Sequence, residues 1–243
     1  MQGKRFLLSR KGSGMARPLF RLSPRLALCA ELVREGSALC DVGTDHAYLP
    51  IHLLKSGKIS RAIAADINPG PLASAANNAE KYEVRGQLIL RLSDGLREIG
   101  AEEADDIVIA GMGGELILRI AAETQWLRQG EKRLILQPMS STEELRIGLR
   151  DLGFAVLEEQ AAEDAGKVYS AFACAYQRTT PETDDLYPYM GKLRPGGEAV
   201  TAYAQKVLRE LRNRLKGAKL GRGEQSPEEL LHIIQSIEAR YLL

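Results

Sequence analysis

The sequence is poor in the residues that build disulfide frameworks, metal centres and membrane spans. Cysteine occurs only at Cys29, Cys40 and Cys174, far apart and without a C-x-x-C pair, which indicates buried thiols in a reducing cytoplasm. None of the three histidines is spaced from a Cys or Glu as metal ligands are, so we expect no metal site. No apolar run reaches the roughly 18 residues of a membrane helix, and we expect no membrane span.

Aromatic residues and net charge are also scarce. Aromatics make up 5% of the chain, which argues against a surface that stacks single-stranded bases. A net charge of +1 carries no information about partners, so only local charge can. The 44% hydrophobic and 27% charged fractions are those of a globular protein, and 243 residues suit one domain with an appendage.

The first 20 residues carry five basic side chains and no acid. A secretory signal would need a longer apolar segment followed by a cleavage site. We therefore interpret residues 1–20 as a flexible basic leader.

Short apolar segments alternate with helical patterns after this leader. A first helix is expected between Ser23, its predicted N-cap, and Gly36, its predicted stop. Ser141 and Glu144 are expected to form a capping box on a later helix. We expect strands at residues 38–42, 61–66, 87–92, 106–110 and 133–137, and further helices at residues 48–56, 69–82, 114–122 and 142–152. This alternation predicts a parallel sheet covered by helices on both faces.

Two more strands are expected at residues 154–159 and 169–176, with the loop "QAAEDAGKV" between them. So short a connection predicts an antiparallel pair. A parallel sheet that ends in an antiparallel hairpin is the order of class I methyltransferases. We therefore predict an α/β, Rossmann-like methyltransferase domain over residues 21–178.

The last segment, residues 179–243, has a different pattern. Apolar residues recur at helical spacing in two stretches, which are separated by "GRGEQSPEEL". Within that break, Ser226 and Glu229 form a predicted capping box with Pro227 at the first helical position. We predict a C-terminal helical hairpin of coiled-coil-like character.

The stretch "DVGTDHAYLP", residues 41–50, joins the first strand to a helix. A dinucleotide-binding loop would read G-x-G-x-x-G, but Asp45 stands at the second glycine and Asp41 ends the strand. Two carboxylates would repel a diphosphate by several kcal/mol at an effective dielectric of about 20. They would favour the cationic S-adenosylmethionine, whose carboxylate can accept from the N–H groups of the turn.

Three later strands end in similar signals. Asp66 lies about 20 residues further on, where an acid binds ribose hydroxyls, and Asp94 with Gly95 follows the third strand. The segment "AGMGG" ends the fourth strand, and its glycines would let a ligand approach the backbone closely. Because the carboxyl ends of parallel strands share one edge, these signals together predict an S-adenosylmethionine site.

The segments "LSPRLALCAELV", "DVGTDHAYLPIHLL", "AADINPGPL", "SDGL", "IAGMGGELI" and "LILQPM" resemble the bacterial tRNA (adenine-22 N1)-methyltransferase family. The resemblance runs from about Leu22 to Tyr176, and the C-terminal hairpin fits that family as well. It departs at Thr44, where many relatives show serine, and in the basic leader. The resemblance implies methyl transfer to N1 of an adenine in tRNA, with cofactor contacts at Asp41, Gly43, Thr44, Asp45, His46, Asp66, Ile67, Asp94, Gly95, Gly111 and Met112.

Methylation of N1 needs little acid–base chemistry, because neutral adenine already carries a lone pair there. The site must align N1, the methyl carbon and sulfur, which is a task of positioning. The sequence lacks the D-P-P-Y or N-P-P-F motif that methylases of exocyclic amino groups use, which argues against N6 as the target. We take Asp45, His46 and Gly111 as the candidate catalytic residues.

Two basic segments predict contacts with RNA phosphates. Residues 201–222 are rich in Lys and Arg and hold a single acid, Glu210, and a second basic segment precedes the first strand. A folded RNA bound through its shape and phosphates suits the low aromatic content. The expected RNA-binding residues are Arg21, Arg25, Lys206, Arg209, Arg212, Lys216 and Lys219.

Other readings of the same patterns remain open at this point. One is a small-molecule methyltransferase whose tail is a lid or a dimerisation element, and another is a scaffold without activity whose hairpin binds a partner. An oxidoreductase that uses a nucleotide is disfavoured by Asp45. We expect a cytoplasmic monomer with tRNA as its partner.

Overall fold

The computed structural model describes residues 19–177, 183–222 and 225–243. The predicted leader therefore lies outside the described residues, except for Leu19 and Phe20. The described residues form one seven-stranded sheet. Its strands are β1 (Leu39–Val42), β2 (Ala62–Asp66), β3 (Leu88–Leu92), β4 (Asp106–Gly113), β5 (Arg133–Ser140), β6 (Phe154–Asp164) and β7 (Lys167–Tyr176).

The strand order is β3-β2-β1-β4-β5-β7-β6. Strands β1 to β5 pair in parallel, whereas β7 is antiparallel to β5 and β6 is antiparallel to β7. The predicted class, a parallel sheet that ends in an antiparallel hairpin, is confirmed. The chain order reverses between β1 and β4, so the crevice beyond their carboxyl ends is where such sheets bind ligands.

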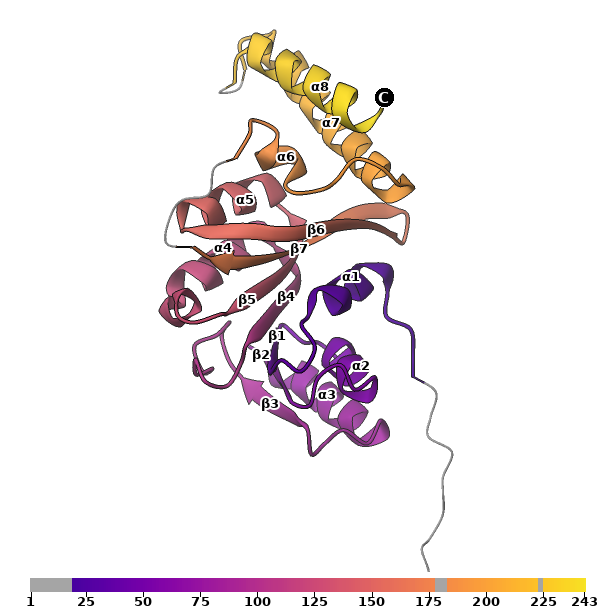
Figure 1. The fold of residues 1–243 in the computed structure, drawn as a ribbon, viewed down its shortest axis with the longest axis vertical. Coiled ribbons are helices and arrows are strands. Elements are labelled where there is room, and N and C mark those ends of the chain that lie inside the picture. The colour runs from indigo at the N-terminus through magenta and orange to yellow at the C-terminus, as the bar shows by residue number, and fades with distance from the viewer. Residues whose placement is uncertain (1–18, 178–182, 223–224) are drawn as a thin grey trace, which may run out of the picture.

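Helices cover both faces of the sheet (Figure 1). Helices α1, α2 and α3 bury apolar side chains against one face, and α4, α5 and the 3-10 turn η1 against the other. The helices are α1 (Pro24–Leu32), α2 (Tyr48–Lys55), α3 (Pro69–Lys81), α4 (Gly114–Glu123), η1 (Gln125–Arg128), α5 (Thr142–Asp151), α6 (Tyr187–Met190), α7 (Glu198–Ala218) and α8 (Pro227–Tyr241).

The prediction that residues 160–168 form a loop between the last two strands is wrong. Strands β6 and β7 pair without a break from Gln160 opposite Ala171 to Asp164 opposite Lys167. Only Ala165 and Gly166 form the turn, at φ of 50° and 74°, the left-handed pair of a tight hairpin. The resulting ribbon is long enough to contact both α1 and α7.

Two of the three predicted helix caps are also wrong. Ser23 makes no capping hydrogen bond, and Ser141 adopts a left-handed conformation, with φ of 51°, in which its side chain caps nothing. The box on α8 is confirmed, because the Ser226 side chain accepts from the Glu229 N–H and the Glu229 carboxylate accepts from the Ser226 N–H. The first helix ends at Leu32, before Gly36.

The C-terminal helices have a core of their own. Helices α7 and α8 lie side by side (Figure 1) and share an apolar cluster with α6 and with Val168 of β7. The hairpin is therefore packed onto the β6–β7 edge of the sheet. The short α6 was not predicted, because four residues that include Pro188 carry no periodic signal. No described helix is both long and apolar enough to cross a membrane.

Candidate methyl-transfer site

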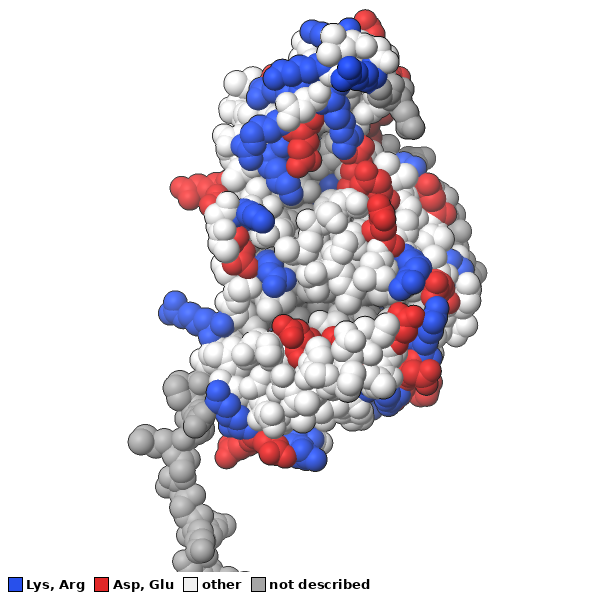
Figure 2. Space-filling view, turned by 180° about the vertical axis from the view of Figure 1, so that it is seen from behind, with Lys and Arg blue, Asp and Glu red and all other residues white. Residues whose placement is uncertain are grey.

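A pocket opens at the carboxyl ends of β1 and β4. Its walls bring together Asp41, residues 43–46 and Gly111, with Phe20 and the start of α1 on its outer side. Most of the predicted residues around the first turn therefore share one cavity. Figure 2 shows a small acidic group in a hollow of a largely uncharged part of this face, below a part that is rich in Lys and Arg.

The turn after β1 is built from left-handed residues. Gly43, Asp45 and Ala47 have φ of 74°, 47° and 56°, and buried Ala47 is the least suited of them to this conformation. Strain of this kind is concentrated at ligand sites. The N–H groups of Gly43 and Thr44 both donate to the Ala65 carbonyl, at 2.8 and 3.1 Å. Among the described residues, no acceptor is found for the N–H groups of Asp45 and His46, which are the ones left to bind an anion.

Asp41 is a buried carboxylate, 6% exposed, that faces this pocket. The Thr44 hydroxyl donates to its Oδ2 at 2.6 Å. Burial raises the pKa of Asp41 to about 6, the Thr44 hydrogen bond opposes that rise, and the charge of Asp66 adds to it. A buried carboxylate held in this way is prepared to receive a cation.

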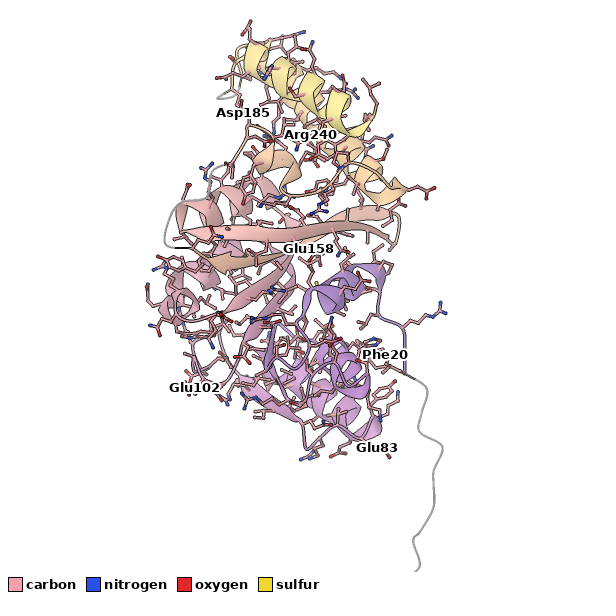
Figure 3. The ribbon with its side chains drawn as sticks, viewed as in Figure 1. Phe20, Glu83, Glu102, Glu158, Asp185 and Arg240 are labelled. Atoms are coloured by element: carbon pink, nitrogen blue, oxygen red, sulfur yellow. The ribbon has the colours of Figure 1, made fainter. Side chains whose placement is uncertain are left out.

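Asp45 and His46 stand at the rim of the pocket. The Asp45 side chain is mostly exposed, with Oδ1 3.6 Å from His46 Nε2, and the imidazole lies 5.4 Å from the Tyr48 ring. Phe20 and Tyr82 lie on the same side of the pocket as Tyr48. The Phe20 ring packs edge to face on both tyrosines, with ring centroids 5.1 Å from Tyr48 and 5.0 Å from Tyr82. Phe20, which Figure 3 labels just after the grey trace, thus lies against α2 and the end of α3. Sequence reasoning missed this aromatic wall, since its members are far apart in the chain.

Asp66 ends β2, the strand beside β1, and Ile67 follows it. The Asp66 carboxylate is buried and accepts from the Asn68 N–H at 2.8 Å, which orients it at the start of α3. Ile67 is a large apolar side chain that is mostly exposed, a position suited to a flat ring. Neither residue lines the Asp41 pocket, and their contacts with a cofactor stay predictions.

Asp94 lies in a second hollow, with Leu96 and Trp126, and not in the Asp41 pocket. Its carboxylate is 2.9 Å from Arg97 and 3.6 Å from Arg119. Gly95 packs against α4, since a Cβ there would lie 3.0 Å from Ile120. Asp94 and Gly95 therefore do not line the Asp41 pocket, and their contacts with a cofactor stay predictions.

The three glycines of "AGMGG" do different things. Gly111 has φ of 77° and lines the pocket, whereas a Cβ on Gly114 would lie 2.2 Å from the Ser141 carbonyl oxygen. A Cβ on Gly113 would lie 3.3 Å from the Ser140 hydroxyl. At Gly114 the absence of a side chain allows α4 to begin against the β5–α5 connection, and a ligand contact at Gly113 and Gly114 stays a prediction. The Met112 side chain covers Gly43, where a Cβ would lie 2.2 Å from its Cε.

Comparison with known proteins gives a consistent answer. The family described as a methyltransferase domain matches residues 22–172. The tRNA (adenine(22)-N(1))-methyltransferase of Bacillus subtilis is 40% identical over 149 residues, which is 61% of this chain and 63% of that protein. A candidate tRNA (m1A22) methyltransferase of Streptococcus pneumoniae is 34% identical, with a TM-score of 0.77 over 90% of this chain and 99% of that one. The chain belongs to the bacterial tRNA (adenine-22 N1)-methyltransferase family.

A second structure from this family contains a ligand. The S. pneumoniae protein was solved in complex with S-adenosyl-L-methionine, with 31% identity, a TM-score of 0.70, and coverage of 88% of this chain and 97% of that one. The chain spans less than two thirds of the length of the B. subtilis family member.

The basic side chains that are expected to bind RNA differ in whether they already contact another side chain. Arg209, Lys216 and Lys219 are exposed on or just beyond α7. Arg212 instead pairs with Glu238 at 2.5 Å, and Lys206 lies 5.6 Å from the centre of the Tyr203 ring. Arg209, Lys216 and Lys219 are therefore the side chains most available to phosphates.

Arg21 and Arg25 stand at the pocket itself. Arg21 is exposed on its outer wall. Arg25 is held by two partners, Asp164 at 3.5 Å and Gln137 at 3.1 Å. Gln137 was not among the predicted site residues, although a polar side chain inside the apolar run "LILQPM" was a signal for it.

Proposed function

We propose that this chain transfers the methyl group of S-adenosylmethionine to N1 of adenine 22 in tRNA. The observation that carries the proposal is the buried Asp41 carboxylate beside an open turn, at the crevice between β1 and β4. The 40% identity to the B. subtilis enzyme supports the same target.

The side chains and N–H groups around the turn fit the chemical groups of this cofactor. Asp41 offers a carboxylate to an ammonium group, and the N–H groups of Asp45 and His46 offer donors to a carboxylate. Asp66 offers acceptors to ribose hydroxyls, and Ile67 an apolar surface to adenine. S-adenosylmethionine supplies an electrophilic methyl group, and no residue has to generate it.

The remaining task of the chain is to hold the target base. N1 of adenine attacks with its own lone pair, so the site gains most from alignment. Positive charge moves onto the base as the bond forms, and the carboxylates of Asp41 and Asp45 stabilise it electrostatically. His46 borders the same space, and the exposed backbone at Gly111 can accept from the adenine amino group.

The decisive experiment is a methylation assay with unmodified tRNA and labelled S-adenosylmethionine, followed by mapping of the modified nucleotide. We expect N1-methyladenosine at position 22. A tRNA in which adenine 22 is replaced by guanine serves as the control and stays unlabelled. Label at another position, or transfer only to a small molecule, would overturn the proposal in favour of a different methyltransferase.

We further propose that α7 holds the tRNA. A groove between the β6–β7 turn and α7 is lined by Lys167, Lys206 and Arg209, and it reaches Met139 at the end of β5. The groove therefore extends from the cations of α7 to β5, the strand that pairs with β4 of the methyl-transfer pocket. Figure 2 shows Lys and Arg gathered over the C-terminal helices.

Replacing Arg209, Lys216 and Lys219 together with Ala tests this contact. Loss of about three phosphate contacts lowers tRNA affinity by roughly 10- to 100-fold near physiological salt. Affinity for S-adenosylmethionine stays unchanged, because the residues lie outside its pocket. Filter binding and calorimetry measure the two affinities. Arg85→Ala, at an exposed arginine near the end of α3, is the matched control, and equal tRNA binding by the triple variant would refute the role of α7.

The setting of this activity is also a proposal. We infer a cytoplasmic, RNA-binding enzyme that works as a monomer, with a methyltransferase domain over residues 21–178 and a tRNA-binding hairpin over residues 179–243. The burial of Cys29, Cys40 and Cys174 supports a reducing compartment. Light scattering on the purified protein tests the monomer.

A further inference from the structure

Gln137 is an amide in a place where the sheet is otherwise apolar. It stands on β5 opposite Ala110 of β4 and is 0% exposed. Its Nε2 donates to the Pro138 carbonyl at 2.9 Å. Its Oε1 accepts two hydrogen bonds, from the Gly111 N–H at 3.2 Å and from Arg25 Nη1 at 3.1 Å. Burying an amide without hydrogen-bond partners is unfavourable, and all three of these hydrogen bonds satisfy the Gln137 amide. Two of the groups that it holds, Gly111 and Arg25, line the pocket.

The first group it joins is the backbone at Gly111. The β4–β5 pairing shifts register between Ala110 and Met112, so Gly111 is bulged out of the ladder. Its N–H donates to the Gln137 side chain on β5 at 3.2 Å. Bulges beside active sites re-aim the chain, and this one presents an exposed peptide to the pocket.

The second group is the guanidinium of Arg25. A Cβ on Gly111 would lie 3.3 Å from Arg25 Nη1, so the arginine lies directly against this peptide. Asp164, from the long β6–β7 ribbon, holds Nε from the other side. The side chain is still 30% exposed, and its Nη2 finds no acceptor in the part of the chain that is described. A donor edge of a fixed cation is therefore free at the pocket wall.

The charge of this guanidinium decides its ligand. The adenine ring becomes cationic as N1 is methylated, so a cation placed on the ring would oppose the reaction. The phosphodiester is the anionic group of the same nucleotide, and an arginine binds it with two parallel hydrogen bonds. An adenine extruded from an RNA stem brings its own phosphate to the rim of the pocket that receives the base.

We propose that Arg25 binds the phosphate of the target adenosine and that Gln137 is the positioning residue that holds this arginine and the Gly111 peptide in register. This inference rests on the proposed function and specifies how that site receives its substrate. The same glutamine thereby links the phosphate contact to the base contact, so the two are made together.

The test measures methylation and tRNA binding in the full-length enzyme. For Arg25→Met, we expect the slope of log affinity against log salt to become shallower by about 0.7–0.9, the value of one phosphate contact. Arg25→Lys keeps the charge and retains the slope. For Gln137→Met, we expect kcat to fall on the order of 100-fold through misplacement of the base, with unchanged affinity for S-adenosylmethionine. Arg85→Met, which removes an exposed arginine paired with Glu80, is the control and leaves slope and kcat as they are.

The double variant Arg25→Met/Gln137→Met separates positioning from simple destabilisation. If the two residues act as one unit, the loss of kcat in the double variant is close to that of the more damaging single variant. Additive losses, or an unchanged salt slope in Arg25→Met, would overturn the inference while wild-type methylation of adenine 22 still stands. A wild-type enzyme that leaves adenine 22 unmodified would instead refute the proposed function.

Discussion

Asp41→Asn is expected to weaken the binding of S-adenosylmethionine by roughly 10- to 150-fold. The substitution keeps the shape of the side chain and an acceptor for the Thr44 hydroxyl, but it removes the negative charge that faces the pocket. A hydrogen bond to a charged group contributes about 1.5–3 kcal/mol, which corresponds to this range. Wild-type affinity should also fall as pH drops below about 6, since protonation of Asp41 has the same effect as the substitution.

The same variant is expected to be more stable than the wild type at pH 7.5. Burial raises the pKa of Asp41 from 3.8 to about 6, so the folded protein holds the proton more tightly than the unfolded chain does. The stability that comes from the protonated form is complete below pH 3.8 and is lost as pH rises through about 6. At neutral pH the ionised carboxylate therefore lowers the free energy of unfolding, by at most about 3 kcal/mol. Asparagine carries no such penalty.

Two measurements on Asp41→Asn check these expectations. Calorimetric titration with S-adenosylmethionine at pH 5.5, 6.5 and 7.5 gives the affinity, and urea unfolding at the same values gives the stability. Asp151→Asn, an exposed acid on α5, is the matched control and should change neither quantity. A variant that binds the cofactor normally, or that is less stable at pH 7.5, would show that Asp41 does not hold a functional charge.

Arg146→Met is expected to lower the free energy of unfolding by about 3–5 kcal/mol, the usual result of breaking a buried ion pair. Arg146 on α5 is 0% exposed and donates to the Glu159 carboxylate of β6. It also donates to the Pro188 and Tyr189 carbonyls at 2.9 Å and to the Tyr203 hydroxyl of α7 at 3.1 Å. Burial works against its charge, but Glu159 and Tyr203 raise the pKa of the guanidinium above its ordinary value.

The location of these partners predicts which part of the protein the Arg146→Met substitution destabilises. The carbonyls and the hydroxyl belong to the C-terminal helices, whereas Arg146 and Glu159 belong to the sheet domain. The substitution leaves the Glu159 carboxylate buried without its cation, and within the described part of the chain the Lys192 N–H at 2.9 Å is then its remaining hydrogen-bond donor. We therefore expect the hairpin to loosen first, with faster proteolysis between residues 185 and 197 and weaker binding of tRNA, while cofactor binding changes less.

The double variant Arg146→Met/Glu159→Leu is the control for this ion pair. Removal of both charges should restore a large part of the lost stability, because it is the unpaired carboxylate that is unfavourable. Urea unfolding of the two variants measures the difference. Wild-type stability in Arg146→Met would show that the pair does not join the two parts of the molecule.

Several parts of the fold and site followed from local patterns. The alternation of strands and helices and the final antiparallel pair were predictable, because β1 to β5 are short apolar runs separated by helical periodicity. The Ser226 cap was predictable because its whole mechanism lies within four residues. The caps at Ser23 and Ser141 do not form, although both serines precede a helix as a cap would, so the residue type alone did not decide them.

The amino-acid sequence by itself determined the fold class, the family and the unusual acidity of the first turn, because each depends on patterns within short segments and on the order of those segments along the chain. The tertiary structure alone decided which side chains share the pocket. Gln137, Arg25 and Asp164 come from three elements far apart in the chain, and Asp94 is drawn into a separate hollow by Arg97 and Arg119. The physical reason is that hydrogen bonds and ion pairs depend on distances of about 3 Å between groups whose spacing along the chain does not constrain them.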